Sequence, residues 1–402
     1  MAITAKRTGV IATVAIIWLI ATSYFVYLSL TSEADSDRRR DMREFQHGVD
    51  FVRRADGKYV LIWSSSGSPL EPEEADGDEW IHDVYYSHID PKNPQLDPVT
   101  LISAPLAQEP ASSAINDDGH IMVTMEDAWN TENVLAQTFG LYDSDMSPIK
   151  AYQQVVFDGG HSGHVTAAGK RFVVFYSEEW VDGGGVDDLG SGDDVLMAVY
   201  DTHGELLHER DVAVGDRTRD WWPLAAGSDR RALLVWQRFV DDKPYARLMY
   251  RMYDPVDDKW VKGETELVKT QEYYTYDVQY IGAIDRFLVT GAYSNGGGFA
   301  FLIAPDGSIS ARNTSLPPLV REAQPAIRTV NGKLLAVYPA APDRLMVLSL
   351  TKTSISLEKR IPVDYRWSYI GTDGIFLDDG TVYFVSLSAN GPKQLKVSVN
   401  LD

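Results

Sequence analysis

The sequence predicts an all-β domain, a seven-bladed β-propeller over residues 46–402, preceded by a single N-terminal transmembrane helix. Short runs rich in Val, Ile, Leu, Tyr and Phe recur seven times, each directly after a Gly or Asp turn, at intervals of 47 to 62 residues. Such runs, separated by Gly, Asp, Asn and Pro, are typical of antiparallel strands. Ahead of them, no residue between Thr8 and Ser32 is charged. The repeat predicts the propeller, and the uncharged stretch predicts the helix.

The N-terminal segment divides into a short tail (1–8), the transmembrane helix (9–30) and a polar stalk (31–45). The uncharged stretch can cross a hydrocarbon core, which requires about 20 apolar residues. The hydrophobic part of a cleaved signal peptide is shorter, roughly 7–15 residues. A cleaved signal with its site near Ala34 is the alternative, and we expect an uncleaved anchor.

The orientation of the helix depends on the basic residues that flank it. Lys6 and Arg7 precede it, whereas four arginines interleaved with acidic residues follow it. A literal count places the C-terminus in the cytoplasm. The short basic N-terminal flank is like that of a signal sequence and favours the opposite orientation. We therefore expect a single-pass protein of the cytoplasmic (inner) membrane, with its propeller on the periplasmic or extracellular side.

Each repeat unit is expected to contain three or four strands. The seven runs expected as second strands are KYVLIW (58–63), HIMVTM (120–125), KRFVVFY (170–176), RRALLVW (230–236), RFLVTG (286–291), KLLAVY (333–338) and TVYFVSL (381–387). A shorter strand-like segment precedes each run, a third strand follows it, and most units add a fourth. Such units suit a propeller, in which each blade covers the apolar face of its neighbour.

The last repeat unit ends at its third strand. Either it stays three-stranded, or the residues after the stalk, around 44–52, supply an outer strand that helps to close the ring. Two packed β-sandwiches are the alternative architecture. We expect one ring, because the repeat continues through residues 46–402 without a linker.

Four sequence segments combine a hydrophobic run or a tyrosine-rich strand with a polar loop. They are YVLIWSSSG, DVYYSHIDP, ALLVWQRF and RLMYRMYDP. They resemble the repeats of sialidase-like, or BNR-type, propellers over most of residues 47–402. This resemblance implies the fold and not the activity, because the Asp-box, the arginine triad and the Tyr-Glu nucleophile pair of sialidases have no match. APDGSIS (304–310) and LDDGTVYF (377–384) are read as ordinary Asp-Gly hairpin turns.

The composition excludes several classes of partner and site. The chain of 402 residues has 37 Lys and Arg against 58 Asp and Glu, a formal net charge of −21. We expect no nucleic-acid partner, because binding to such a polyanion begins with basic side chains that neutralise phosphates. The sequence contains no Cys and therefore no disulfide, thiolate metal site or Cys nucleophile.

Two segments without Lys or Arg, 71–83 and 178–194, hold fourteen carboxylates. Both connect the second and third strands of a unit. Because strands alternate in direction, these connections and those between blades should emerge on one face. The candidate Ca²⁺ ligands are Asp182, Asp187, Asp188, Asp193 and Asp194. Calcium prefers carboxylate oxygens, but the order of an EF-hand loop is missing, so a solvated acidic loop is the alternative.

The connections between blades bring aromatic and polar side chains to the mouth of the central channel. The candidate ligand-binding residues are His161, His164, Arg219, Asp220, Trp221, Tyr274, Asp277, Arg321, Glu322, Arg366 and Trp367. Aromatic-lined mouths of closed β architectures with a few convergent polar groups are common binding sites. The alternatives are structural roles for the two histidines and channel-sealing roles for tryptophans, which we expect for Trp222 rather than Trp221.

Two functions fit these observations. The first is a recognition or scaffolding module that presents an acidic, aromatic-rich face to a protein partner or a glycan. The second is a carbohydrate-active enzyme, either a sialidase-like glycoside hydrolase or a polysaccharide lyase. For the enzyme, Asp220 could pair with Asp277 or Glu322 as two catalytic carboxylates, and the arginines could clamp a substrate carboxylate. We expect the first function, because no catalytic constellation is evident.

Overall fold

The computed structural model describes residues 46–66, 82–127, 135–178, 192–215, 218–240, 243–388 and 390–399. All regular secondary structure in these ranges is β-strand, as predicted. Within the same ranges, no helix is long and apolar enough to cross a membrane. The expected tail (1–8), transmembrane helix (9–30) and stalk (31–45) lie outside the described residues.

The strands form six sheets in which neighbouring strands are consecutive in the chain. The first sheet contains β1 (Gln46–Arg53), β2 (Tyr59–Ser65), β3 (Asp83–Ile89) and β4 (Val99–Ile102). The second contains β5 (Gln108–Ile115), β6 (Ile121–Asp127), β7 (Ala136–Tyr142) and β8 (Pro148–Asp158). The third contains β9 (Gly160–Ala168), β10 (Arg171–Glu178), β11 (Asp194–Tyr200) and β12 (Leu206–Ala213). Each is an antiparallel meander.

The fourth sheet has seven strands because one long strand belongs to two meanders. It contains β13 (Asp220–Gly227), β14 (Ala232–Phe239), β15 (Ala246–Asp254), β16 (Lys259–Ile281), β17 (Arg286–Tyr293), β18 (Gly298–Ile303) and β19 (Ile309–Leu316). The first half of β16 pairs with β15, and its second half pairs with β17. The chain therefore passes from one meander to the next without a break in β-structure.

The last two sheets complete the chain. One contains β20 (Ala326–Val330), β21 (Lys333–Ala340), β22 (Arg344–Thr351) and β23 (Ser354–Pro362). The other has three strands, β24 (Thr372–Phe376), β25 (Thr381–Ser386) and β26 (Lys393–Ser398). A three-stranded final unit was one of the two expected outcomes.

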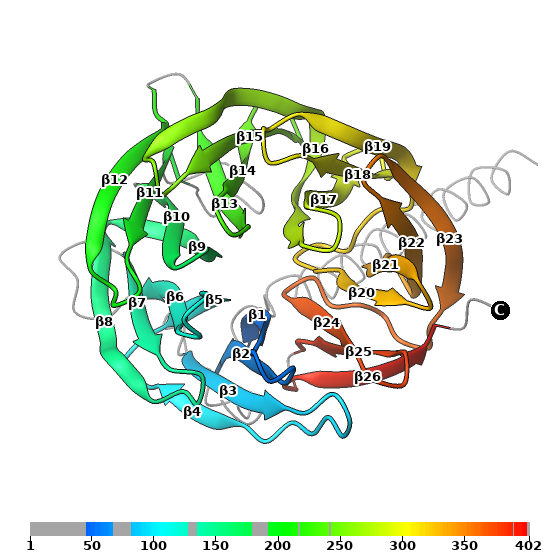
Figure 1. Ribbon diagram of the computed structural model, residues 1–402, viewed down its shortest axis with the longest axis horizontal. Coiled ribbons are helices and arrows are strands. Elements are labelled where there is room, and N and C mark those ends of the chain that lie inside the picture. The colour runs from blue at the N-terminus through cyan, green and yellow to red at the C-terminus, as the bar shows by residue number, and fades with distance from the viewer. Residues whose placement is uncertain are drawn as a thin grey trace, which may run out of the picture. The chain divides into compact units, whose positions relative to one another are not determined.

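The sheets surround a common axis, with the first strand of each meander innermost (Figure 1). These inner strands are β1, β5, β9, β13, the second half of β16, β20 and β24. Strand β1 contacts both β5 and β24, so the first and last sheets meet. This closed ring excludes the alternative of two packed sandwiches.

The runs expected as second strands all form strands next to an inner strand: β2, β6, β10, β14, β17, β21 and β25. The expectation that residues 44–52 add an outer strand to the last sheet is wrong. Residues 46–53 instead form β1, the innermost strand of the first sheet. The reason is their burial: Val49 and Val52 are buried among inner strands, a position that an outer edge would not provide.

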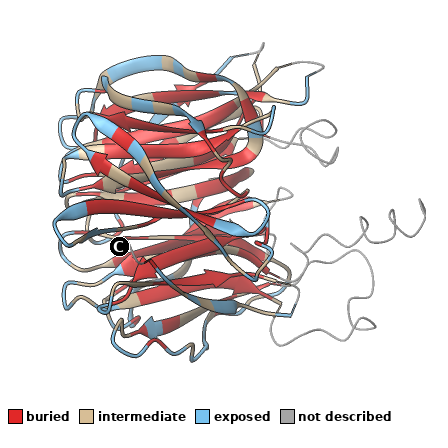
Figure 2. Cartoon of the chain, turned by 90° about the vertical axis from the view of Figure 1, so that its right-hand side faces the viewer, coloured by how far each residue is buried: buried red, intermediate tan, exposed pale blue. Residues whose placement is uncertain are grey.

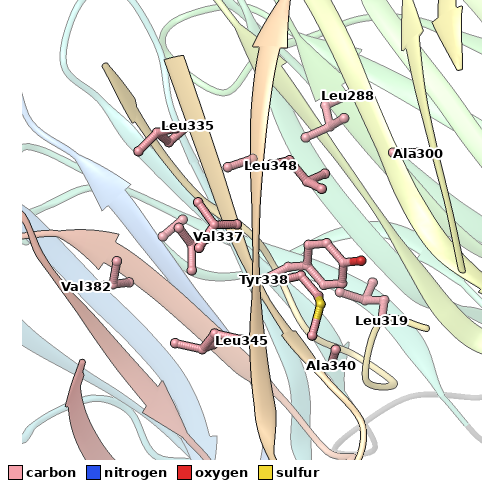
Figure 3. Close-up of a cluster of buried hydrophobic side chains, with 14 of the residues drawn as sticks. Leu288, Ala300, Leu319, Leu335, Val337, Tyr338, Ala340, Leu345, Leu348 and Val382 are labelled. Atoms are coloured by element: carbon pink, nitrogen blue, oxygen red, sulfur yellow. The ribbon is translucent and has the colours of Figure 1, made fainter. Parts of the chain in front are cut away.

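Apolar side chains fill the spaces between adjacent sheets. Figure 3 shows one such cluster, in which Leu288 and Ala300 from the fourth sheet approach Leu348 from the fifth, with Val382 from the sixth on the other side. Exposed residues gather at turns and on outer strands such as β12 and β23 (Figure 2). The interleaved apolar layers hold neighbouring sheets together through the hydrophobic effect.

The ring has two ends that differ in their connections. The turn face carries the tight turns between first and second strands, where Gly57 and Gly119 take the positive φ of 83° and 79° that favours glycine. The loop face carries the connections between meanders and those between second and third strands. Here the backbone N–H of Asp220 donates to Asp193 O at 2.8 Å, which joins the two kinds of connection as expected.

Candidate functional site

Strained backbone marks the loop-face end of the inner strands. The backbone angle φ lies between 50° and 70° at five positions there, four of which are not glycine: Gly48, Ser162, Trp222, Tyr274 and Glu322. The register of β1, β13 and β16 shifts beside these residues. Left-handed conformations of ordinary residues are costly and concentrate at functional sites. The repeated bulge therefore points to the loop-face end of the axis as a candidate site.

His47 occupies the centre of this end of the ring. Its Nδ1 lies 2.9 Å from Glu109 Oε2 and its Nε2 lies 3.1 Å from Glu322 Oε2. Burial alone would lower the pKa of His47, but the two carboxylates outweigh it and raise this pKa to about 10. The imidazolium therefore donates to both carboxylates at neutral pH. His82 Nδ1 lies 3.8 Å from the same Glu109 oxygen.

Glu126 provides a second, partly buried carboxyl group nearby. Its Oε1 accepts hydrogen bonds from the backbone N–H of Ser162 and from Ser162 Oγ at 3.0 Å. Burial raises the pKa of Glu126 to about 7, and the neighbouring Glu109 charge contributes. These bonds hold Ser162 in its left-handed conformation.

Aromatic rings pack around the axial histidine. Trp222 lies 5.3 Å from His164 and 5.0 Å from Tyr274 between ring centroids, and its carbonyl accepts a hydrogen bond from the Tyr276 hydroxyl. Trp221 packs against His161 at 4.6 Å. Both tryptophans and Tyr274 are buried. These rings close the loop-face end of the axis around His47.

The three candidate arginines have separate surroundings. Arg321 Nε lies 3.2 Å from Glu322 Oε1, and its guanidinium covers the Tyr274 ring at 4.5 Å. Arg219 lies over Phe239 at 5.6 Å. Arg366 is exposed. The structure therefore brings Arg321, Glu322 and Tyr274 together but does not join the three arginines in one contact group.

Two other candidates have structural partners. Asp220 is fully buried and accepts hydrogen bonds from Arg238 Nε at 2.7 Å and from Trp236 Nε1 at 2.7 Å. Trp367 packs in the hydrophobic core and donates to Arg344 O at 3.1 Å. In each suggested catalytic pair that includes Asp220, the Asp220 carboxylate is therefore already engaged in an ion pair with Arg238.

Only the bases of the acidic segments fall within the described residues. Asp193 and Asp194 stand at the start of β11, where Asp194 Oδ1 accepts the Gly215 N–H at 3.0 Å. The other candidate calcium ligands, Asp182, Asp187 and Asp188, lie outside the described residues. Among the residues that are described, no group of three or more His, Cys, Asp or Glu could hold a metal ion.

A central channel with a cavity volume of about 750 Å³ runs between the inner strands below the axial histidine. Its lining includes Asp50, Asp277 and Asp373, which come from β1, β16 and β24. Burial raises the pKa of all three carboxyl groups, that of Asp277 to about 8. His164 also lines the channel, and burial lowers its pKa to about 4, so its ring is neutral.

Sequence reasoning found part of this arrangement. It selected His164, Tyr274, Asp277, Arg321 and Glu322, which lie at or near the axis. It missed the contributions of four inner-strand residues: His47, Asp50, Glu109 and Asp373. The signal available was position, since each of them lies in the segment that precedes a second-strand run.

Comparisons with known proteins place the fold. No family model and no curated protein sequence matches the chain. The WD40 domain of Toxoplasma gondii coronin is similar in structure, with a TM-score of 0.51 and 8% identity over 88% of this chain and 85% of that domain. The chain is a β-propeller.

Other similar structures are a Hadza microbial sialidase and a lectin of Aleuria aurantia. The sialidase has a TM-score of 0.44 and 10% identity, over 81% of this chain and 75% of its own. The lectin has a TM-score of 0.44 and 11% identity, over 79% of this chain and 96% of its own. A sialidase therefore stands among the structures that are similar to this chain, in line with the predicted resemblance, and similarity this distant carries no activity with it.

Proposed function

We propose that this protein is a recognition module, a propeller anchored by its N-terminal helix to the outer side of the cytoplasmic membrane. It presents its loop face to a protein partner or a glycan. The proposal rests on the propeller fold, on the uncharged stretch from Thr8 to Ser32 and on the acidic segments, whose described ends lie at the loop face. Propellers expose many loops on one rigid face, which suits recognition.

We count seven blades in this propeller. The seven-stranded sheet contains two meanders that share β16, and the other five sheets each contain one. Division of β16 near Gln271, which pairs with residues of both β15 and β17, gives one blade for each second-strand run.

The observation that carries the proposal is the way the loop-face charges are engaged. Asp220 is held by Arg238, and Glu322 is held by His47 and Arg321. A catalytic carboxylate pair needs groups free to exchange protons with a substrate. The charges near the axis instead brace the inner strands, which makes a rigid platform for the loops around it.

The acidic segments supply the recognition chemistry. Their described ends, Asp83, Glu178 and Asp194, lie at the loop-face ends of β2–β3 and β10–β11 connections. A concentrated negative field favours basic partners and accelerates their association. We therefore propose that the preferred protein partner presents a basic surface.

The experiment compares two triple variants of the full chain that change the net charge equally. The first carries Asp182→Asn, Asp187→Asn and Asp188→Asn in the acidic segment. The control carries Glu205→Gln, Glu209→Gln and Asp211→Asn on or beside the outer strand β12, where these residues are exposed. Partner capture from solubilised membranes is quantified after cross-linking. Loss of capture in the first variant alone is expected, and equal capture by both variants would contradict the proposal.

A second candidate is glycan processing at the loop face. The specific observation is that Glu109 and Glu322 face each other across His47, while Tyr369, 40% exposed, lies 5.8 Å from the Arg321 guanidinium. Exposed aromatic rings suit sugar stacking, and paired carboxylates suit glycoside hydrolysis. Incubation of the full chain with a glycan and polyuronide panel, with and without Ca²⁺, tests it. Absence of turnover on every substrate would remove the enzyme candidate.

A further inference from the structure

The central channel contains buried carboxyl groups that the proposed recognition at the loop face does not use. Asp50, Asp277 and Asp373 lie on three inner strands that are not all adjacent, yet the charge of Asp50 raises the pKa of both other groups. Side chains from β1 and β16 can interact in this way only if both point toward the axis. The three carboxyl groups therefore form a layer across the channel, here called the channel acid layer.

Asp277 is the member of this layer with unused hydrogen-bonding capacity. It is 7% exposed, and its Oδ2 has no hydrogen-bond partner among the described residues. Its neighbours Tyr276 and Val278 point into the hydrophobic core. Because side chains alternate along a strand, Asp277 points the other way, into the channel. A buried acceptor without a donor costs free energy, and a ligand that donates to it would remove that cost.

The other two carboxylates are already held by the protein. Asp50 accepts hydrogen bonds from Ser113 N at 2.6 Å and from Gln324 Nε2 at 2.6 Å, one to each oxygen. Asp373 likewise accepts from Phe51 N at 2.7 Å and from Gly374 N at 2.6 Å. Both groups are thus fixed in place, whereas Asp277 has an oxygen that is open to a ligand.

Basic side chains of the channel do not neutralise this layer. His164 is neutral because burial lowers its pKa. Arg328 donates to Leu377 O at 2.7 Å and lies 3.6 Å from Asp378, at the turn face. Arg53 is exposed. Within the described part of the lining, no basic side chain therefore supplies the positive charge that would favour ionisation of the channel acid layer, and a cation from outside could supply it.

The geometry points to a binding site for the protonated amine of an alkylammonium ligand in the channel acid layer, with Asp277 as its direct acceptor. A metal ion would need several open oxygens, whereas a single ammonium needs one short contact, and its positive charge favours the ionised form of the carboxyl group that it contacts. An alkyl chain would lie along Ile115, Leu224 and Ile375, which also line the channel.

Access is from the turn face. Gly57, Pro91 and Ala283 line the channel at turns on that side. At the other end, His47 and Tyr274 lie three residues before Asp50 and Asp277 on the same strands, roughly 10 Å further along the axis, and both are buried. The channel is thus a blind funnel with the acid layer at its base, so a linear amine fits better than a branched one.

The test measures binding by the full chain in detergent with isothermal titration calorimetry. Two probes distinguish the possible sources of the amine: spermidine represents a free polyamine, and a short lysine-containing peptide represents the side chain of a partner. An uncharged alcohol of matched length is the negative control. Saturable binding of spermidine assigns a free amine, and binding of the peptide assigns a partner's lysine. Binding of neither, or equal binding of the alcohol, would overturn the inference.

Asp277→Asn removes the ionisable carboxyl group with almost no change in shape. We expect it to weaken binding of whichever amine binds by about 10-fold or more, as for loss of a buried charged hydrogen bond. The matched control is Asp211→Asn, which changes the net charge equally on the exposed outer strand β12 and should leave affinity unchanged. Thermal melting without ligand confirms that both variants fold. Unchanged affinity in a folded Asp277→Asn variant would also overturn the inference.

Discussion

His47 on β1 donates to Glu322 across 275 residues of sequence, with Nε2 3.1 Å from Oε2. The same ring donates to Glu109 through Nδ1 at 2.9 Å. One imidazolium therefore ties the first inner strand to β5 on one side and to the segment before β20 on the other. The contact bridges the point at which the ring closes, since β1 also meets β24.

Replacement of His47 should destabilise the ring substantially. His47→Gln leaves two buried carboxylates without their shared cation, and loss of one partner of a buried ion pair typically costs about 3–5 kcal/mol. Urea denaturation of the full chain measures the free energy of unfolding. His203→Gln on an exposed turn is the control and should be neutral. A loss below about 1 kcal/mol for His47→Gln, in the range of exposed ion pairs, would show that the contact does not stabilise the fold.

The same ion pair predicts lower stability at alkaline pH. The pKa of His47 is raised from 6.5 to about 10 in the folded protein. Its contribution is therefore fully present below pH 6.5 and is lost as the pH rises through 10, because the folded state binds the proton more tightly than the unfolded state. Melting temperatures of the wild-type chain and of His47→Gln should converge between pH 7 and 10. A difference in melting temperature between the two proteins that stays constant across this pH range would contradict the assignment of the raised pKa to His47.

The strand pattern could be predicted from the sequence because it depends on local properties. Runs such as KRFVVFY combine β-propensity with a preceding turn, and this run forms most of β10. The closure was harder. Residues 44–52 carry an apolar pattern that suits either an inner or an outer strand, and the burial of Val49 depends on contacts with distant residues. The local sequence pattern predicts that a segment is a strand, whereas the position of that strand in a sheet depends on tertiary contacts.

The axial site was predicted in part for a related reason. Glu322 and Asp277 were selected because they lie in connections between blades. His47 and Asp50 fall in the segment just after the stalk, which the sequence suggests as a possible outer strand of the last unit and not as part of a site. Their partners lie far away in the chain, and a single sequence contains no signal for such pairing. The burial and ion pairing of Asp220 likewise depend on Arg238, which the pairing of β13 with β14 brings next to it.

Calcium binding by the acidic segment 178–194 stays a prediction, and measurement of the melting temperature can test it. A ligand that binds only the native state raises the melting temperature, and the increase continues with the logarithm of its concentration above the dissociation constant. We expect Ca²⁺ to raise the melting temperature of the full chain, and EDTA to reverse the effect. The triple variant Asp182→Asn, Asp187→Asn and Asp188→Asn should not respond, while the β12 control variant should. Identical curves with and without Ca²⁺ would leave a solvated acidic loop as the correct interpretation.

Asp277→Asn should stabilise the protein in the absence of ligand, and more so as the pH rises. The pKa of Asp277 is raised from 3.8 to about 8 by burial and by the Asp50 charge. Between these values the folded state binds the proton that the unfolded state releases, so the wild-type carboxyl lowers stability progressively as the pH increases. The groups that face it, Asp50 and Asp373, add to the effect, and neutral His164 does not oppose it.

Asparagine does not titrate, so the gain in melting temperature of Asp277→Asn over the wild type should be small at pH 4 and largest near pH 8. Differential scanning fluorimetry across this range measures it, with Asp211→Asn as the charge-matched control. Binding of an amine would reverse the order, because the ligand stabilises only the protein that keeps the carboxylate. If the variant is less stable than the wild type at pH 8 without ligand, the Asp277 carboxylate already has a stabilising partner within the folded protein. That result would contradict an open acceptor for a cation.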